Sequence, residues 1–275
     1  MIDMSNFMKG SFDAFDINLV QKEVGGGIVT AKQIDEAVKS SPNARSIVIS
    51  GLKQDTFEHF VHKYGKQFEA ISFWKNKLVS DLSPLESLDT VKYINYFFNQ
   101  RAASLWDMKG NTNLRGLCIY NFSRLHNINE IETAPVLEFF GIGNAVWKCT
   151  EIESLRPAAK SAVTHLECYA GVLDGDYKCL ANGNILELDM NPTQFTVEEL
   201  AELLSLFPVT LKGTITKPYV ESGIRDKNGR YTKYYFLCKN RKRCIEGTDD
   251  KRFAEYLKEF DELLMQKRHE KGTAI

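Results

Sequence analysis

The sequence predicts an α/β solenoid, in which parallel strands stack one on the next to form a curved horseshoe with about eight repeats. The first observation is a recurring spacing of apolar residues, with starts at positions 44, 68, 91, 114, 136, 163, 185 and 211. The intervals of 22 to 27 residues fall within the roughly 20–29 residues of one class of α/β repeat. The second observation is an asparagine that closes the clearest copies. The third is a hydrophobic content of 43%, which is enough for a continuous core.

The clearest copies are Phe68–Asn76 and Val91–Asn99, which lie 23 residues apart. In each, apolar residues at positions one, four and six are predicted to point into the core, where stacked neighbours bury them. The asparagine at position nine is predicted to hydrogen-bond backbone groups where the chain leaves the strand. Asn76, Asn99 and Asn144 have this role in the predicted alignment.

These copies follow the pattern L-x-x-L-x-L-x-x-N, so residues 44–216 resemble the leucine-rich-repeat superfamily. The segment Leu82–Leu88 resembles the convex side of short bacterial, internalin-like repeats. The resemblance implies a parallel sheet on the concave face of the horseshoe. It also implies a binding role, although this superfamily carries many unrelated ones.

The pattern divides the chain into residues 1–43 as an N-terminal cap, 44–208 as the repeats, and 209–275 as the last repeat strand with a C-terminal cap. In the first segment Thr30 and Gln33 form a predicted capping box ahead of a short amphipathic helix. A strand at residues 231–238 and a helix at residues 253–264 are predicted to form the C-terminal cap.

Composition excludes several classes of function. The formal net charge is -1, which gives no general reason to expect nucleic acid or a membrane as partner. No apolar run approaches the roughly 18 residues of a membrane span, and the first residues lack the pattern of a secretory signal. The cysteines form no C-x-x-C pair, so reduced thiols in a cytoplasmic protein are expected.

Side chains at repeat positions three, five and seven alternate with the core residues and are therefore predicted to face outward from the concave sheet. Many of these outward side chains are aromatic, and a continuous aromatic surface of this kind is typical of a binding site. The predicted column at position seven consists of Ser50, Trp74, Phe97, Tyr120, Ile142, Tyr169, Asn191 and Lys217. The predicted neighbours of this column are Tyr93, Phe98 and Phe140.

A predicted acidic cluster adjoins the aromatic column toward the C-terminal half. Glu138, His165 and Glu187 share position three of consecutive repeats, and Glu167 and Asp189 share position five. An apolar anchor with nearby Lys or Arg would match both features. We therefore expect a non-enzymatic scaffold that binds a protein or peptide with apolar and basic groups, and no catalytic residue, metal or cofactor.

Several alternatives stay open at this level. The aromatic side chains could pack on one another, be covered by a terminal arm, or close a structural homodimer. The acidic cluster could be an ordinary solvated face. Glu138, His165 and Glu187 could instead hold a metal in a hydrolase, because carboxylates with one imidazole suit zinc, manganese or iron.

Overall fold

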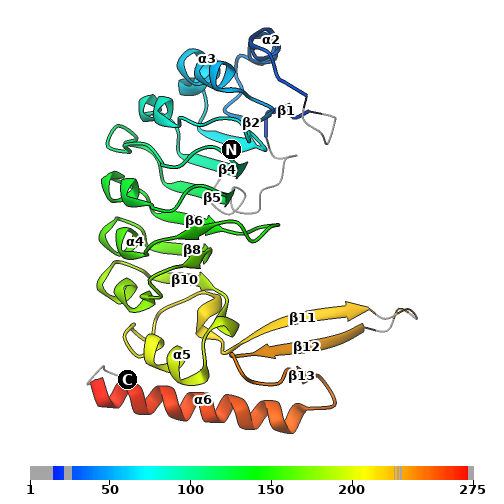
Figure 1. Cartoon of the computed structure of the whole chain (residues 1–275), viewed down its shortest axis with the longest axis vertical. Helices are drawn as coiled ribbons and strands as arrows, with labels where there is room; N and C mark the ends of the chain where they lie inside the picture. The colour runs from blue at the N-terminus through cyan, green and yellow to red at the C-terminus, as the bar shows by residue number, and fades with distance from the viewer. Residues whose placement is uncertain (1–14, 22–26, 226, 228, 230, 272–275) are drawn as a thin grey trace. The chain divides into compact units, whose positions relative to one another are not determined.

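The structure is a computed structural model that describes residues 15–21, 27–225, 227, 229 and 231–271. It divides into two compact units, Met1–Asn184 and Ile185–Ile275 (Figure 1). The sequence also predicts a flexible turn at Gly25–Gly27 and a turn at residues 226–229. Of these, Gly25, Gly26 and residues 226 and 228 lie outside the described residues.

The first unit contains a large parallel sheet whose strands follow one another in chain order. Each strand of this sheet hydrogen-bonds to the sheet strands that precede and follow it along the chain. In the first unit the strands of this sheet are β1 (Ile17–Leu19), β2 (Ser46–Ser50), β3 (Ala70–Trp74), β4 (Tyr93–Asn99), β5 (Gly116–Phe122), β6 (Phe139–Gly143) and β8 (His165–Tyr169). Two short strands, β7 (Glu151–Ile152) and β9 (Gly171–Val172), form a separate parallel pair.

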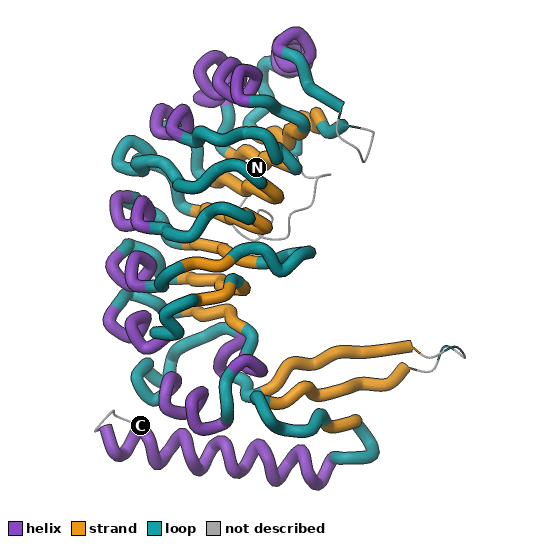
Figure 2. The backbone as a smooth tube through the Cα atoms, viewed as in Figure 1, coloured by secondary structure: helices purple, strands orange, loops and turns teal. Residues whose placement is uncertain are grey.

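Helices and turns connect the strands and lie along one face of this sheet (Figure 2). The α-helices are α2 (Ala31–Ser40), α3 (Gln54–Tyr64) and α4 (Arg156–Lys160), and the 3₁₀ helices are η2 (Gly65–Gln67), η3 (Ser83–Ser87), η4 (Asn129–Thr133) and η5 (Tyr177–Asn182). The capping box predicted at Thr30 and Gln33 is confirmed, since both of its hydrogen bonds are present at the start of α2.

The core of the first unit lies between the sheet and these connections. Alternate side chains of neighbouring strands meet there in register and are fully buried, as Ile71, Ile94 and Leu117 show. Burial of each such aliphatic side chain stabilises the fold by roughly 1.5–3 kcal/mol. The apolar spacing in the sequence therefore identifies the residues that hold the sheet to its connections.

Asparagine side chains at or just after the ends of strands hydrogen-bond to backbone groups of the preceding strand and connection. Asn76 accepts a hydrogen bond from the N–H of Leu52 at 2.8 Å and donates to the carbonyl of Ile49 at 3.0 Å. Asn99 donates to the carbonyls of Asn76 and Val79 at 3.1 and 2.8 Å. The backbone-bonding role predicted for these asparagines is confirmed.

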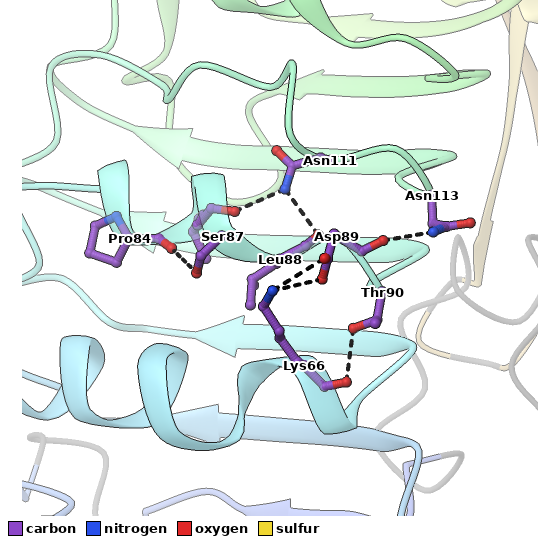
Figure 3. Close-up of polar contacts among 9 residues, drawn as sticks. Lys66, Pro84, Ser87, Leu88, Asp89, Thr90, Asn111 and Asn113 are labelled. Atoms are coloured by element: carbon purple, nitrogen blue, oxygen red, sulfur yellow. Dashed lines mark hydrogen bonds and ion pairs between the residues drawn. The ribbon is translucent and has the colours of Figure 1, made fainter.

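A second series of polar contacts joins consecutive connections near η3 (Figure 3). The fully buried side chain of Asn111 donates to the carbonyls of Leu85 and Leu88 at 2.9 and 3.0 Å, and accepts from the indole N–H of Trp106 at 2.7 Å. The exposed Asn113 donates to the carbonyl of Asp89 at 2.7 Å. Asparagine amides thus satisfy backbone groups that helices and strands leave unpaired.

The second unit combines two helices with an antiparallel sheet. Its elements are β10 (Glu187–Met190), η6 (Pro192–Gln194), α5 (Val197–Leu204), η7 (Thr214–Thr216), β11 (Tyr219–Arg225), β12 (Tyr231–Leu237), β13 (Cys244–Ile245) and α6 (Asp250–Lys271). Helix α6 packs against α5, and its buried Tyr256 donates to the carbonyl of Pro218 at 2.6 Å. Among the described helices, none combines the length and the apolar character that a membrane crossing requires.

The structure corrects the predicted fold class. We expected a leucine-rich-repeat solenoid with terminal caps, whereas the fold is α/β with a large parallel sheet and a separate antiparallel sheet. The last predicted repeat strand, from position 211, is the 3₁₀ helix η7, and the predicted C-terminal cap belongs to a compact unit that starts at Ile185. The physical reason is that alternating apolar residues indicate a strand with one buried face, and this pattern does not specify one repeat family.

Candidate binding surface on the parallel sheet

The outward side chains of the parallel sheet follow a register that can be read strand by strand. Trp74 pairs with Phe97, Phe97 with Tyr120, and Tyr120 with Gly143. Gly143 in turn pairs with Tyr169. We call the side of the sheet that carries Trp74, Phe97 and Tyr120 the aromatic face.

One strand of the predicted register is wrong by one residue. The structure places Gly143, and not Ile142, in the column at β6, and it pairs Phe140 with Leu117 in the core. Phe140 is fully buried there, so the structure places it away from the aromatic face. The error arose at the start of this segment, where Leu137 is buried and Val136, which we aligned as position one, is 37% exposed.

Four aromatic rings, which we call the aromatic ladder, lead from the aromatic face to its rim. The rings of Trp74 and Phe97 are stacked with centroids 4.3 Å apart. Phe98 lies 6.4 Å from Phe97 and 5.0 Å from Trp147, centroid to centroid. Trp147 is 49% exposed and its neighbour Val146 is 63% exposed, so the ladder ends in an exposed apolar tip.

Local backbone conformation places the last two rings. Phe98 has a left-handed φ of 65°, which breaks the side-chain alternation of a strand. The Asn121 amide then holds the loop that carries Trp147. It donates to the carbonyl of Trp147 at 2.7 Å and accepts from the N–H groups of Ala145 and Val146, both at 3.1 Å. The sequence analysis did not identify Trp147 as a site residue. The available signal was Asn121, which lies one place before position nine of the repeat that starts at Leu114.

A polar pair lies farther along the aromatic face. The hydroxyl of Tyr120 donates to Glu167 Oε1 at 2.7 Å, and burial raises the pKa of Tyr120 well above its ordinary value. Gly141 lies on β6, between the strand of Tyr120 (β5) and the strand of Glu167 (β8). A Cβ on Gly141 would be 2.5 Å from the Tyr120 hydroxyl oxygen. The neighbouring His165 makes an edge contact with the ring of Phe139 at 4.7 Å.

The middle of the aromatic face is covered by the chain itself. Phe15 and Tyr120 pack against a buried cluster of Ala70, Tyr93, Cys118 and Phe139. Next to Phe15, the carboxylate of Asp16 accepts the N–H groups of Arg45 and Ser46 at 2.8 and 3.0 Å. Tyr93, which belongs to this cluster, is only 9% exposed, and Phe97, which stacks on Trp74, is only 6% exposed. These two predicted site residues therefore offer little surface to another molecule.

The predicted acidic cluster loses one member, Glu138. Glu138 precedes β6, and its carboxylate pairs with Arg115 at 2.8 Å, whereas Phe139 occupies the place beside His165. Glu167 joins Tyr120 as described. Glu187 and Asp189 belong to the second unit. There the backbone of Glu187 forms an isolated parallel β-bridge with that of Lys212, and the Asp189 carboxylate accepts the N–H of Thr214 at 2.8 Å. The register therefore removes Glu138 from the metal-binding alternative.

No protein-family model matches the chain, and no curated protein is similar enough to count as a match. Neither result bears on the resemblance to leucine-rich repeats, and neither supplies a function.

Proposed function

We propose that the chain is a non-enzymatic binding protein that holds an apolar side chain of a protein or peptide at the tip of the aromatic ladder. The observation that carries this proposal is the exposed pair Val146 and Trp147. Tryptophan is one of the side-chain types enriched among the residues that dominate binding energy at interfaces.

The ladder supports this role because it limits the movement of the tip. Trp147 is in contact with Phe98, and its backbone is tied to the buried amide of Asn121. A side chain already restricted in this way loses less conformational entropy on binding than a mobile one. Lys75, whose Nζ lies 5.5 Å from the centroid of the Trp74 ring, adds a positive charge at the other end of the ladder.

We place the basic group of the partner at Glu167, which belongs to the predicted acidic cluster. The hydroxyl of Tyr120 fixes the position of the Glu167 carboxylate, and a fixed carboxylate beside aromatic rings favours Lys or Arg of a partner. A reducing, cytoplasmic setting is part of the proposal and is supported by the six cysteines, all of which are free thiols.

The test is a peptide-display selection on the purified chain, followed by titration of the selected peptides. We expect peptides with an aromatic or aliphatic anchor, whose affinity falls by at least about tenfold in Trp147→Ala, as for loss of a central anchor. The matched control is Leu186→Ala, since Leu186 is 60% exposed and lies in the other unit.

Two outcomes separate the proposal from its rivals. Peptides that bind Trp147→Ala as well as they bind the wild-type chain would refute the ladder tip as the site. Loss of affinity in Glu167→Gln only for peptides that contain Lys or Arg would support the assigned place of the basic group, and equal affinity would remove it.

A further inference from the structure

The antiparallel sheet of the second unit has an open edge. Its strand order is β11-β12-β13, so β11 is paired on one side only, over the register from Tyr219↔Leu237 to Arg225↔Tyr231. Among the described residues, no backbone hydrogen bond outside this pairing involves β11. Natural edge strands are usually protected by charged side chains (lysine above all), proline or a bulge. Tyr219–Arg225 contains neither lysine nor proline, and its two charged residues, Glu221 and Arg225, lie on the face opposite Val220 and Ile224.

The two faces of the hairpin differ. On one face, Tyr235 stacks on Phe253 of α6 with centroids 4.1 Å apart, so this face is covered near its base. The opposite face carries Val220, Ser222 and Ile224 of β11 beside Phe236, Tyr234 and Thr232 of β12. Val220 is 37% and Ile224 50% exposed, which leaves an apolar strip open beside the open edge.

The sequence of β11 is complementary to itself about Ser222. If a second copy of β11 pairs antiparallel with Ser222 opposite Ser222, then Val220 faces Ile224 and Glu221 faces Gly223. At the ends, Arg225 faces Tyr219, which places a guanidinium beside an aromatic ring. Like charges never stand opposite one another in this register, and apolar side chains meet on the face that is open in the single chain.

From this we infer that β11 is a self-association edge, through which two copies of the chain join their hairpins into one continuous antiparallel sheet. The pairing is isologous, as expected for a twofold dimer. It is independent of the binding surface on the parallel sheet and would stand if that proposal failed. One strand pair buries less than the roughly 1,200 Å² of standard interfaces, so the dimer forms reversibly as protein concentration rises.

Sedimentation velocity over about 10–500 µM protein tests the inference, since weak interfaces dissociate in this range. We expect a dimer in the wild-type chain and at least about tenfold weaker association in Val220→Lys/Ile224→Lys, where lysines face each other. In Val220→Lys/Ile224→Glu the register puts Lys opposite Glu, so the dimer is retained. The control Met265→Lys, at a 56% exposed position on α6, leaves association unchanged.

Oxidative crosslinking tests the register separately. Ser222→Cys places the two introduced thiols opposite each other, whereas in Val220→Cys they are four residues out of step, or about 13 Å apart. We expect a covalent dimer from Ser222→Cys only. A wild-type chain that stays monomeric at every concentration would overturn the inference, as would a Val220→Lys/Ile224→Lys variant that associates like the wild type. Equal crosslinking of both cysteine variants would overturn it as well.

Discussion

The hydroxyl of Tyr120 reaches across β6 to donate to Glu167 at 2.7 Å, and it does so over Gly141. A methyl group on Gly141 would stand 2.5 Å from that hydroxyl oxygen. The absence of a side chain at Gly141 is therefore what allows residues on β5 and β8 to bond directly.

We expect Gly141→Ala to lower the free energy of unfolding by about 1–3 kcal/mol, as for overpacking, and Tyr120→Phe to lower it by about 1 kcal/mol. The loss of stability caused by Gly141→Ala should be smaller in the Tyr120→Phe background, because the hydroxyl oxygen that would lie closest to the added methyl group is then absent. Urea denaturation of both single variants and the double variant measures this coupling. Strictly additive effects would show that the hydroxyl and the glycine are not linked.

The exposure of the ladder tip can be checked by fluorescence quenching. Trp147 is 49% exposed and Trp106 only 2%, and the chain has three tryptophans. Trp147→Phe should therefore reduce quenching by acrylamide, and Trp106→Phe should raise the average accessibility of the remaining emission. If Trp147→Phe left quenching unchanged, the tip would not be exposed in solution.

Asn111 and Asn113 form a matched pair for the asparagine contacts of Figure 3. Asn111→Ala removes three hydrogen bonds from a fully buried amide, and buried groups left without partners should cost about 3 kcal/mol or more in total. Asn113→Ala removes one exposed bond and should cost under about 1 kcal/mol. Similar losses in a denaturation experiment would contradict the assigned roles.

Asp35 links α2 to α3 and should make stability depend on acid pH. Hydrogen bonds from Lys63, His59 and Tyr64 hold the pKa of its carboxyl well below the usual range. An unfolded aspartate has a pKa of about 3.9, so the stabilisation is complete above that pH. It is lost as pH falls through the lower folded pKa.

Asp35→Asn should therefore be less stable than the wild type near neutral pH and should show a flatter loss of stability below about pH 4. Thermal unfolding at a series of pH values measures this. Glu36→Gln, at an exposed position on the same helix, is the control. Parallel curves for the wild type and Asp35→Asn would argue against the contact.

Cysteine reactivity should be concentrated at one residue. Burial raises the pKa of the Cys168 thiol to about 12 and that of Cys179 to about 11, and fewer thiolates mean slower reaction. Cys149 is only half-buried. A disulfide reagent should modify Cys149 first, and Cys149→Ser should remove the fast phase. A fast phase that survives this substitution would contradict the prediction.

The sequence predicted local structure better than it predicted the fold. The strands through Ile71 and Ile94, the capping box at Thr30 and the backbone role of Asn76 are all confirmed. Each depends on residues a few positions apart. The predicted horseshoe was wrong, because apolar spacing constrains a strand's two faces and leaves its wider assembly open.

The candidate site was predicted only in part, for a related reason. Trp74, Phe97 and Tyr120 lie in the predicted column. The residue that gives the ladder its exposed tip, Trp147, depends on Asn121, which lies 26 residues away. The choice between Val136 and Leu137 as the buried residue depends on packing, which two adjacent apolar letters do not reveal.

The backward reach of Asn76, Asn99 and Asn111 has a consequence for how the chain is made. Each of these side chains completes the hydrogen bonding of a stretch that lies 20 to 27 residues earlier. The ribosome synthesises the earlier stretch first, so its carbonyl groups lack these hydrogen bonds until the later asparagine has been translated. Each of these earlier stretches can therefore gain its asparagine hydrogen bonds only after a later part of the chain has been synthesised.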